Sequence, residues 1–174
     1  MFKHLRTLLI TGAVGLLAMG SAIAGPSPQT TTFLVSANVI KSCSVSATAL
    51  AFGTYDPLAA TDTTGTSTVS VQCTKTTVAT IALNGGVNGS LAQRKMKDTG
   101  SSTDLLNYQL YTTAGNTAVW GDGTGGTSTQ SYTSASAATV QPFTVYGTIP
   151  SSQNVTPSSV ANSYQDTITV TITF

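Results

Sequence analysis

Residues 167–174 read TITVTITF, the most regular β-strand pattern in the sequence. Ile168, Val170, Ile172 and Phe174 alternate with four threonines, which is the period of two expected when one face of a β-strand is apolar. A half-buried strand at a chain terminus frays unless another element holds it. We therefore expect the apolar face of this strand to be covered by something else.

A second apolar stretch, TTTFLVSANVI, occupies residues 30–40 and also follows a period of two. Its apolar face consists of Phe33, Val35, Ala37 and Val39. Neither stretch has an obvious hairpin partner, which leaves two alternatives. The two strands pair within one molecule and complete a sandwich, or they pair between molecules and form a head-to-tail fibre. Periodicity alone does not choose between them.

Short β-type segments separated by turn residues fill the rest of the chain. The predicted strands lie at 44–52, 67–72, 78–83, 105–111 and 140–149. Two Asn-Gly pairs, at Asn84 and Asn88, favour tight hairpin turns. The basic run 94–97 is interpreted as a solvated turn or an edge strand. No segment shows a sustained period of 3.6, so the sequence predicts an all-β antiparallel sandwich.

Composition excludes several classes of protein. Only 7% of the residues are charged, against 40% hydrophobic, and 53 of the 174 residues are Thr or Ser. Seven basic and six acidic residues provide no cluster able to neutralise nucleic acid or anionic lipid, so we expect no nucleic-acid partner. A mean hydropathy of +0.17 with little net charge also argues against disorder.

Residues 1–24 have the features of a cleaved signal peptide, with a basic start, an apolar stretch and an Ala-Ile-Ala site before Gly25. The domains expected are therefore this signal peptide, an N-terminal extension over 25–41 and a single domain over 42–174. The only histidine is His4 and there is no glutamate, so the exported chain lacks an imidazole base and a zinc ligand set. We expect no enzyme activity, no metal and no cofactor.

Cys43 and Cys73 are the only cysteines, and both lie in the exported part. An even number in an oxidising compartment predicts one structural disulfide, with two free thiols as the alternative.

Three other motifs have simple structural interpretations. Asp98-Thr-Gly-Ser resembles an aspartic-protease motif, but the second carboxylate that such chemistry needs has no candidate, so we interpret it as a polar turn. The glycine-rich run 121–126 has one carboxylate and is interpreted as a surface loop. Trp120 is expected to be a packing residue. Asn88 and Asn154 match the glycosylation pattern, which is frequent in Thr-rich chains.

A family resemblance rests on motifs that occur in order along the chain. They are 52–57 (FGTYDP), 106–111 (LNYQLY) continuing to 119–123 (VWGDG), 145–150 (VYGTIP), and 164–166 (YQD) before the TITVTITF tail. Together they resemble the spore coat U domain, a family that includes the major subunits of archaic chaperone-usher pili. The chain differs at Ala161-Asn162-Ser163, where a glycine is expected.

The resemblance implies an incomplete immunoglobulin-like sandwich that a donor strand from a neighbouring subunit completes. Phe33, Val35, Ala37 and Val39 would be the donor residues. Ile168, Val170, Ile172 and Phe174 would form one wall of the acceptor groove and contact the chaperone, with the Phe174 carboxylate held by basic residues of that chaperone. The implied partners are other copies of this chain, a periplasmic chaperone and an outer-membrane usher.

The function expected is that of a pilus subunit, exported through the periplasm to the cell surface, that supports attachment and biofilm formation. One alternative is a secreted, spore-coat-like structural protein that does not form pili. Another is a carbohydrate-binding adhesin domain, although tip adhesins of this kind usually carry an additional domain.

Overall fold

The structure is a computed structural model that describes residues 25–100, 102–158 and 160–174. The predicted signal peptide, residues 1–24, lies outside the described residues. The chain divides into two units, residues 1–38 and residues 39–174. In the described part of the first unit no residue belongs to a strand. The strand predicted over residues 30–40 is thus not formed within the single chain, because a strand needs a second backbone with which to bond.

The second unit consists of antiparallel β-structure, and the residues that the structure describes contain no helix. The strands are β1 (Cys43–Ala47), β2 (Thr63–Cys73), β3 (Val78–Leu83), β4 (Arg94–Asp98), β5 (Leu105–Tyr111), β6 (Gln130–Thr133), β7 (Gln141–Ile149), β8 (Tyr164–Gln165) and β9 (Val170–Thr173). Within the described residues, no helix has the length and apolar character that crossing a membrane requires.

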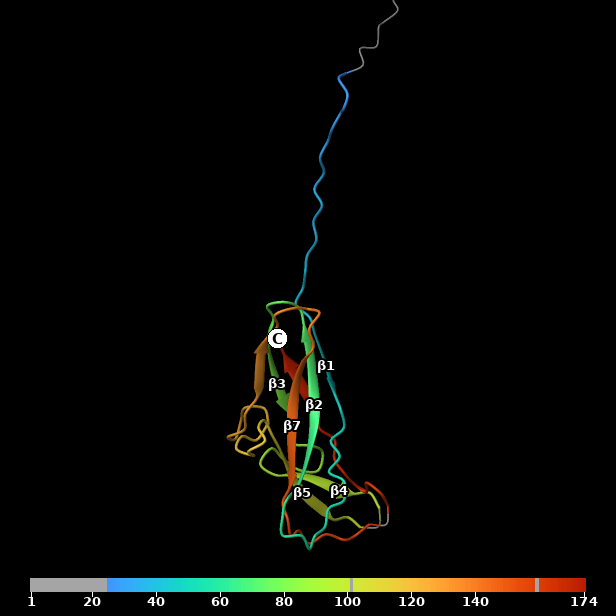
Figure 1. Cartoon of the computed structure of the whole chain (residues 1–174), viewed down its shortest axis with the longest axis vertical. Coiled ribbons are helices and arrows are strands. Elements are labelled where there is room, and N and C mark those ends of the chain that lie inside the picture. The colour runs from blue at the N-terminus through green and yellow to red at the C-terminus, as the bar shows by residue number, and fades with distance from the viewer. Residues whose placement is uncertain (1–24, 101, 159) are drawn as a thin grey trace, which may run out of the picture. The chain divides into compact units, whose positions relative to one another are not determined.

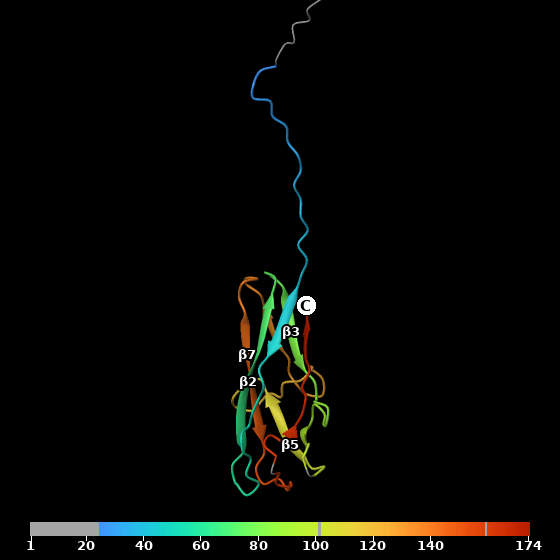
Figure 2. The same cartoon turned by 90° about the vertical axis from the view of Figure 1, so that its right-hand side faces the viewer.

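The strands form two sheets that face each other (Figure 1). The larger sheet has the order β1-β2-β7-β5-β4-β8 and the smaller has the order β6-β3-β9. The central pair, β2 and β7, extends over nine residue pairs from Thr63↔Ile149 to Val71↔Gln141. β1 is an edge strand of the larger sheet and β9 is an edge strand of the smaller one. Figure 2 shows β1 running downward and the C-terminal strand running upward to the chain end.

Alternate residues of the strands point into the space between the sheets, as a period of two requires. The buried apolar residues are Val69, Val71, Cys73, Ala79, Ile81, Leu83, Leu106, Tyr108, Leu110, Trp120, Val145 and Ile149. Trp120 is fully buried and its Nε1 donates a hydrogen bond to the Ile81 carbonyl oxygen at 3.1 Å. The prediction that Trp120 is a packing residue is confirmed.

Most predicted strands are found close to their expected bounds. Residues 78–83 and 105–111 match β3 and β5, and the predicted strand at 140–149 corresponds to β7. The segment expected at 44–52 ends as a strand at Ala47, and β6 was not expected from the sequence. The short polar sequence of β6, QSYT, has no apolar alternation that would have revealed it.

The structure corrects the expected hairpins in the loop before β4 and decides between the two interpretations of the run 94–97. The two Asn-Gly pairs do not form tight hairpins, because β3 pairs with β6 and β9 whereas β4 pairs with β5 and β8. The loop therefore carries the chain from one sheet to the other. The run 94–97 is a strand rather than a solvated turn. It pairs with β5 along its length, whereas β8 pairs with it only from Lys97 onward, so residues 94–96 have a partner strand on one side only.

Candidate functional site

An open groove leads into the sandwich between the edges of its two sheets. It has a volume of about 1050 Å³. One side is formed by residues 47–55 and 57, which continue from β1. The other is formed by residues 155–158, 160–168 and 170, which lead into β9. The apolar floor comes from both sheets and includes Val69, Leu83, Leu106, Leu110, Val145 and Ile149. The edges of β1 and β9 are each paired on one side only, so they offer free backbone groups to a further strand.

The β1 side of the groove is set by two glycines. Gly65 and Gly147 are paired across β2 and β7. A Cβ atom on Gly147 would lie 2.7 Å from Phe52 Cζ and 2.9 Å from Leu50 Cδ1, so both side chains lie directly on the glycine backbone. The Phe52 ring also packs edge-to-face on Tyr108, with centroids 6.2 Å apart. Because the two glycines have no side chains, Leu50 and Phe52 of the segment after β1 can pack directly against the sheet.

The β9 side is a segment in which the chain changes sheets between β8 and β9. Asp166 accepts a hydrogen bond from Tyr108 Oη at 2.7 Å and one from the Val87 amide at 2.8 Å. Asn84 holds Thr169 at two points: its amide donates to the Thr169 carbonyl oxygen at 3.1 Å, and its Oδ1 accepts from the Thr169 amide at 2.8 Å. Burial and the hydrogen bond to Asp166 raise the pKa of Tyr108. The wall is therefore fixed by contacts within the single chain.

Arg94 supports this wall from inside the protein, where it is fully buried. Its Nε and Nη2 donate to the Asn84 carbonyl oxygen at 3.0 and 2.7 Å, and Nη2 also donates to the Trp120 carbonyl oxygen at 2.7 Å. Nη1 donates to Gln109 Oε1 at 2.5 Å. Burial lowers the pKa of the guanidinium from its ordinary value. The sequence interpretation missed this role, although Arg94 shares one strand face with Met96 and could have been assigned inward on that ground.

The four predicted groove residues lie on one face of the last segment. Ile168 and Val170 line the groove, and Ile172 is half-buried against the core. Phe174 is 51% exposed. The threonines between them are exposed, so the alternation seen in the sequence is the alternation of inner and outer faces. Their contact with a donor strand or a chaperone stays a prediction.

The four predicted donor residues are all exposed. Phe33 is 85% exposed, Val35 is 79% exposed and Val39 is 85% exposed, and Ala37 belongs to the same set. Large apolar side chains with this much exposure are unusual when they follow one another in regular alternation. The role of these residues as donors stays a prediction.

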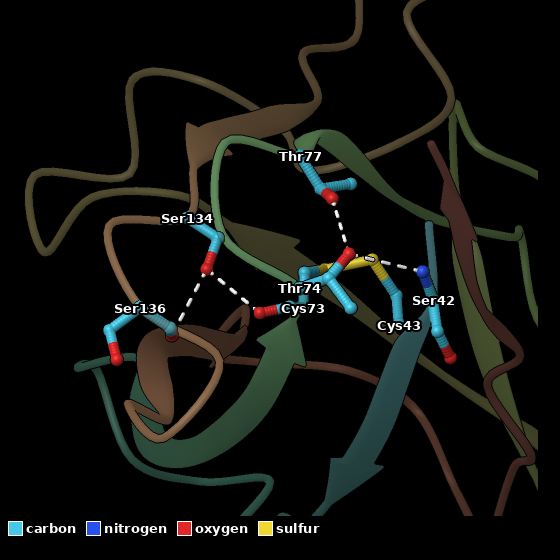
Figure 3. Close-up of a disulfide and its surroundings, with 7 residues drawn as sticks. All are labelled: Ser42, Cys43, Cys73, Thr74, Thr77, Ser134 and Ser136. Carbon is cyan, nitrogen blue, oxygen red and sulfur yellow. Dashed lines mark hydrogen bonds between the residues drawn. A yellow bond between two sulfur atoms is a disulfide. The ribbon is translucent and has the colours of Figure 1, made fainter. Parts of the chain in front are cut away.

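A disulfide joins Cys43 and Cys73, as the sequence predicts (Figure 3). The two residues are directly opposite each other at the start of β1 and the end of β2. The pairing continues one residue further, because the Thr74 amide donates to the Ser42 carbonyl oxygen at 2.9 Å. Ser134 Oγ donates to the Cys73 carbonyl oxygen at 2.9 Å, which connects this end of the sheet to the loop after β6. The place where the extension joins β1 is thus firmly held.

Two carboxylates that suggested chemistry serve as turn acceptors. Asp98 accepts bonds from the Gly100 and Ser102 amides, both at 2.9 Å, and from Ser102 Oγ at 2.7 Å. These bonds, with that of Gly100 the strongest, lower the pKa of Asp98 to about 2. Asp122 accepts from the Thr124 amide and hydroxyl, which lowers its pKa, and lies in an exposed loop. Across the described ranges, no three His, Cys, Asp or Glu side chains gather as a possible metal site.

One turn departs from the glycine that the family pattern leads us to expect. Asn162 occupies the left-handed region, with a φ of 55°. Asparagine tolerates this region better than other residues that carry a Cβ, because its short side chain bonds locally. The substitution therefore preserves the turn.

These observations define an incomplete immunoglobulin-like sandwich, in which two antiparallel sheets enclose an apolar interior that is open along one side. The chain belongs to the spore coat protein U family, because the Spore Coat Protein U domain model matches residues 29–171. It is 38% identical over 180 residues to Protein U of Myxococcus xanthus, in an alignment that covers 95% of this chain and 94% of that protein.

The fold is also similar to a solved structure. This is the crystal structure of the CsuC-CsuE chaperone-tip adhesion subunit pre-assembly complex from the archaic chaperone-usher Csu pili of Acinetobacter baumannii, with a TM-score of 0.56. The identity is 24%, and the alignment covers 78% of this chain and 40% of that one. Our chain therefore spans about 40% of the length of the chain that it matches. At this level of identity the similarity establishes the fold.

Proposed function

We propose that this protein is a structural pilus subunit that polymerises by donor-strand exchange. In each contact, residues 30–40 of one copy fill the groove beside β9 of the next copy. The observation that carries the proposal is that one chain holds both an apolar groove with free strand edges and a separate segment of exposed, alternating apolar residues. Strand addition to an exposed sheet edge is an established mode of peptide recognition.

The energy of such a contact is a balance between apolar burial and the cost of ordering the donor strand. Burial of Phe33, Val35 and Val39 contributes about 1.5–3 kcal/mol each, or roughly 5–9 kcal/mol in total. Ala37 and a ladder of backbone hydrogen bonds add to this. Ordering about ten residues costs a comparable amount, so the persistence of the fibre would depend on slow unfolding of the completed sandwich as much as on affinity.

The groove also explains the need for assembly partners. An open apolar groove with free edges is prone to aggregation, so a periplasmic chaperone would occupy it until an outer-membrane usher brings the next subunit. The similarity to a chaperone-bound pilus subunit supports this part of the proposal. Export through the periplasm to the cell surface, with a role in attachment and biofilm formation, follows from the same assignment.

A second candidate is a secreted coat protein that does not form pili. The family name and the 38% identity to Protein U favour it. The two candidates differ in whether the groove receives a strand from another copy.

The test compares two aspartates on opposite faces of the proposed donor strand. Val35→Asp places a carboxylate among the residues that would enter the apolar groove, whereas Ser36→Asp places it on the outer face. We expect Val35→Asp to abolish fibres in electron micrographs of the chain expressed in the periplasm with its chaperone and usher, because a buried unpaired carboxylate costs several kcal/mol. Ser36→Asp should leave fibres intact.

Chaperone binding provides the control for folding. Both variants should be recovered with the chaperone as wild type is, since the groove that the chaperone occupies is unchanged. Normal fibres from Val35→Asp, or from a chain that lacks residues 30–40, would exclude the donor assignment and favour the coat protein.

A further inference from the structure

The backbone is held in place by β2 at Ser42 and Cys43, where the extension joins β1. The Cys43–Cys73 disulfide closes the ladder between β1 and β2. Beyond it, Thr74 bonds both backbone groups of Ser42: its amide donates to the Ser42 carbonyl oxygen at 2.9 Å, and its Oγ1 accepts from the Ser42 amide at 3.2 Å (Figure 3). The direction of the chain at Ser42 is therefore set by β2. Lys41 is the nearest residue at which the chain can reverse.

The fixed position of Ser42 restricts how a chain could place its own extension in its groove. A strand parallel to β1 would have to begin beside Cys43 and end at the far end of the groove, where residue 40 would then lie. Residue 40 is joined to Ser42 by two peptide units, which reach at most about 7 Å, whereas the five residues of β1 alone extend over about 16 Å. The only route left for self-insertion is a hairpin in which residues 30–40 run antiparallel to β1.

The inner face of β1 is known from its register. Cys43 lies opposite Cys73 and Val45 lies opposite Val71, and residues directly opposite each other share a face of the sheet. Cys73 and Val71 are buried in the core. Cys43 and Val45 therefore lie on the inner face of β1, where Val45 is 37% exposed.

The loop length of the hairpin decides which face of the extension meets the core. A two-residue loop at 40–41 would place Asn38 opposite Cys43 and Ser36 opposite Val45. Asn38 and Ser36 would then point inward and the face of Val35 and Ala37 would point to solvent, because a shift of one residue turns every side chain of a strand to its opposite face. A four-residue loop fails in the same way. Only a loop with an odd number of residues directs the apolar face inward.

The shortest odd loop is one that this sequence disfavours. A three-residue loop over 39–41 would place Ala37 opposite Cys43, which is the correct face. Such loops have a type I turn followed by a left-handed residue, usually glycine. Here Val39 and Ile40 would have to adopt helical dihedrals and Lys41 the left-handed region, which suits none of them. Val39 would also be lost from the apolar face.

We propose that residues 39–42 disfavour completion of the groove by the chain's own extension, so that a strand from a second copy fills it instead. A strand from another molecule is not tied to Ser42, and its direction and register are set by the groove alone. This inference rests on the proposed donor role of residues 30–40. Residues 39–42 would thus determine whether the chain forms a closed monomer or an open fibre.

The test introduces a favourable three-residue turn at residues 39–41. In the first variant, Val39→Pro, Ile40→Asp and Lys41→Gly create the Pro-Asp-Gly sequence typical of a type I turn that ends in a left-handed glycine. The matched control, Ile40→Asn with Lys41→Gly, creates an Asn-Gly pair that favours a two-residue loop at 40–41, which places Asn38 opposite Cys43 and so keeps the loop even. Val39→Ala alone measures the cost of losing that side chain. Each full chain is refolded with its disulfide formed and analysed by light scattering and electron microscopy.

We expect the first variant to be a folded monomer. A strand on a short loop has an effective concentration of about 1 mM, so at a chain concentration of about 1 µM self-insertion is favoured about a thousandfold over a second copy. The variant should therefore form no fibres and should not bind a labelled peptide of residues 30–40. The control and Val39→Ala should still assemble.

Assembly of the first variant to the wild-type extent would overturn the inference, and so would equal amounts of folded monomer from the first variant and its even-loop control. If the first variant does not fold, Lys41→Gly alone should still shift the wild-type distribution toward folded monomer, and no shift would again overturn the inference. A wild-type chain that remains a folded monomer would contradict the proposed function itself.

Discussion

Replacing Arg94 with methionine tests whether the buried guanidinium organises the groove. Methionine keeps most of the apolar volume of the side chain and removes the charge and the donors. Two main-chain carbonyl oxygens lose the hydrogen bonds that Arg94 gives them: that of Asn84, with donors at 3.0 and 2.7 Å, and that of Trp120, with a donor at 2.7 Å. Because Asn84 also holds Thr169, the loss is transmitted to the groove wall.

The expected cost follows from these contacts. A buried acceptor left without its partner costs about 1–3 kcal/mol, so two of them cost about 2–6 kcal/mol. Removing the buried charge also removes its desolvation cost, so the net loss in the free energy of unfolding is about 2–4 kcal/mol. For a chain of this length that corresponds to a fall in Tm of roughly 5–15 °C.

Urea unfolding of the disulfide-bonded protein measures the loss, and binding of a labelled peptide of residues 30–40 measures its effect on the groove. Arg94→Lys should show an intermediate loss, since one ammonium cannot reach all the acceptors. Lys97→Met, in the same strand but exposed, should have little effect. If Arg94→Met were as stable as wild type and bound the peptide equally well, the guanidinium would be no more than a tolerated buried charge.

Three further outcomes are expected in unfolding experiments. Replacing both Cys43 and Cys73 with alanine should lower the free energy of unfolding by about 3–4 kcal/mol, since the bridge closes a loop of 30 residues. Asp98 has a folded-state pKa of about 2, below the ordinary 3.8, so the stability it contributes is present above pH 4 and is lost as the pH falls from 4 to 2. Asp98→Asn should flatten this part of the stability profile, and an unchanged profile would contradict the assignment. Gly147→Ala should cost about 1–3 kcal/mol by overpacking, and Phe52→Leu in the same chain should recover part of it. Additive losses in a double-mutant cycle would show that the two residues do not touch.

Period-two patterns predicted the parts of the fold that depend on local sequence. Residues 78–83 and 105–111 were placed correctly because alternation and turn residues act over a few positions. The disulfide was predictable since only one pairing of two cysteines exists. The strand expected at 167–174 is shorter in the structure, because the chain changes sheets before β9 begins. The hydrogen bonds that fix this crossing join Asp166 to Tyr108 and Val87, which are distant in the sequence.

The support for the groove could not be predicted in the same way. Arg94 was assigned to a solvated or edge run because buried arginines are normally paired with carboxylates, and here the partners are carbonyl oxygens and an amide. Carbonyl acceptors are present at every residue and leave no signal in the sequence. The contact of Phe52 with Gly147 joins residues 95 positions apart, and its only local trace is a glycine within a strand.

The disulfide has a mechanical consequence for a fibre assembled as proposed. Tension along such a fibre would enter each subunit through the extension and reach the five-residue edge strand β1 first. Without a covalent link, only the backbone pairing of β1 with β2 would carry this load. The bond between Cys43 and Cys73 transfers the force to β2, which is anchored to β7 over nine residue pairs. Reduction of that bond would then add, in every subunit, a second non-covalent link at which the filament could break.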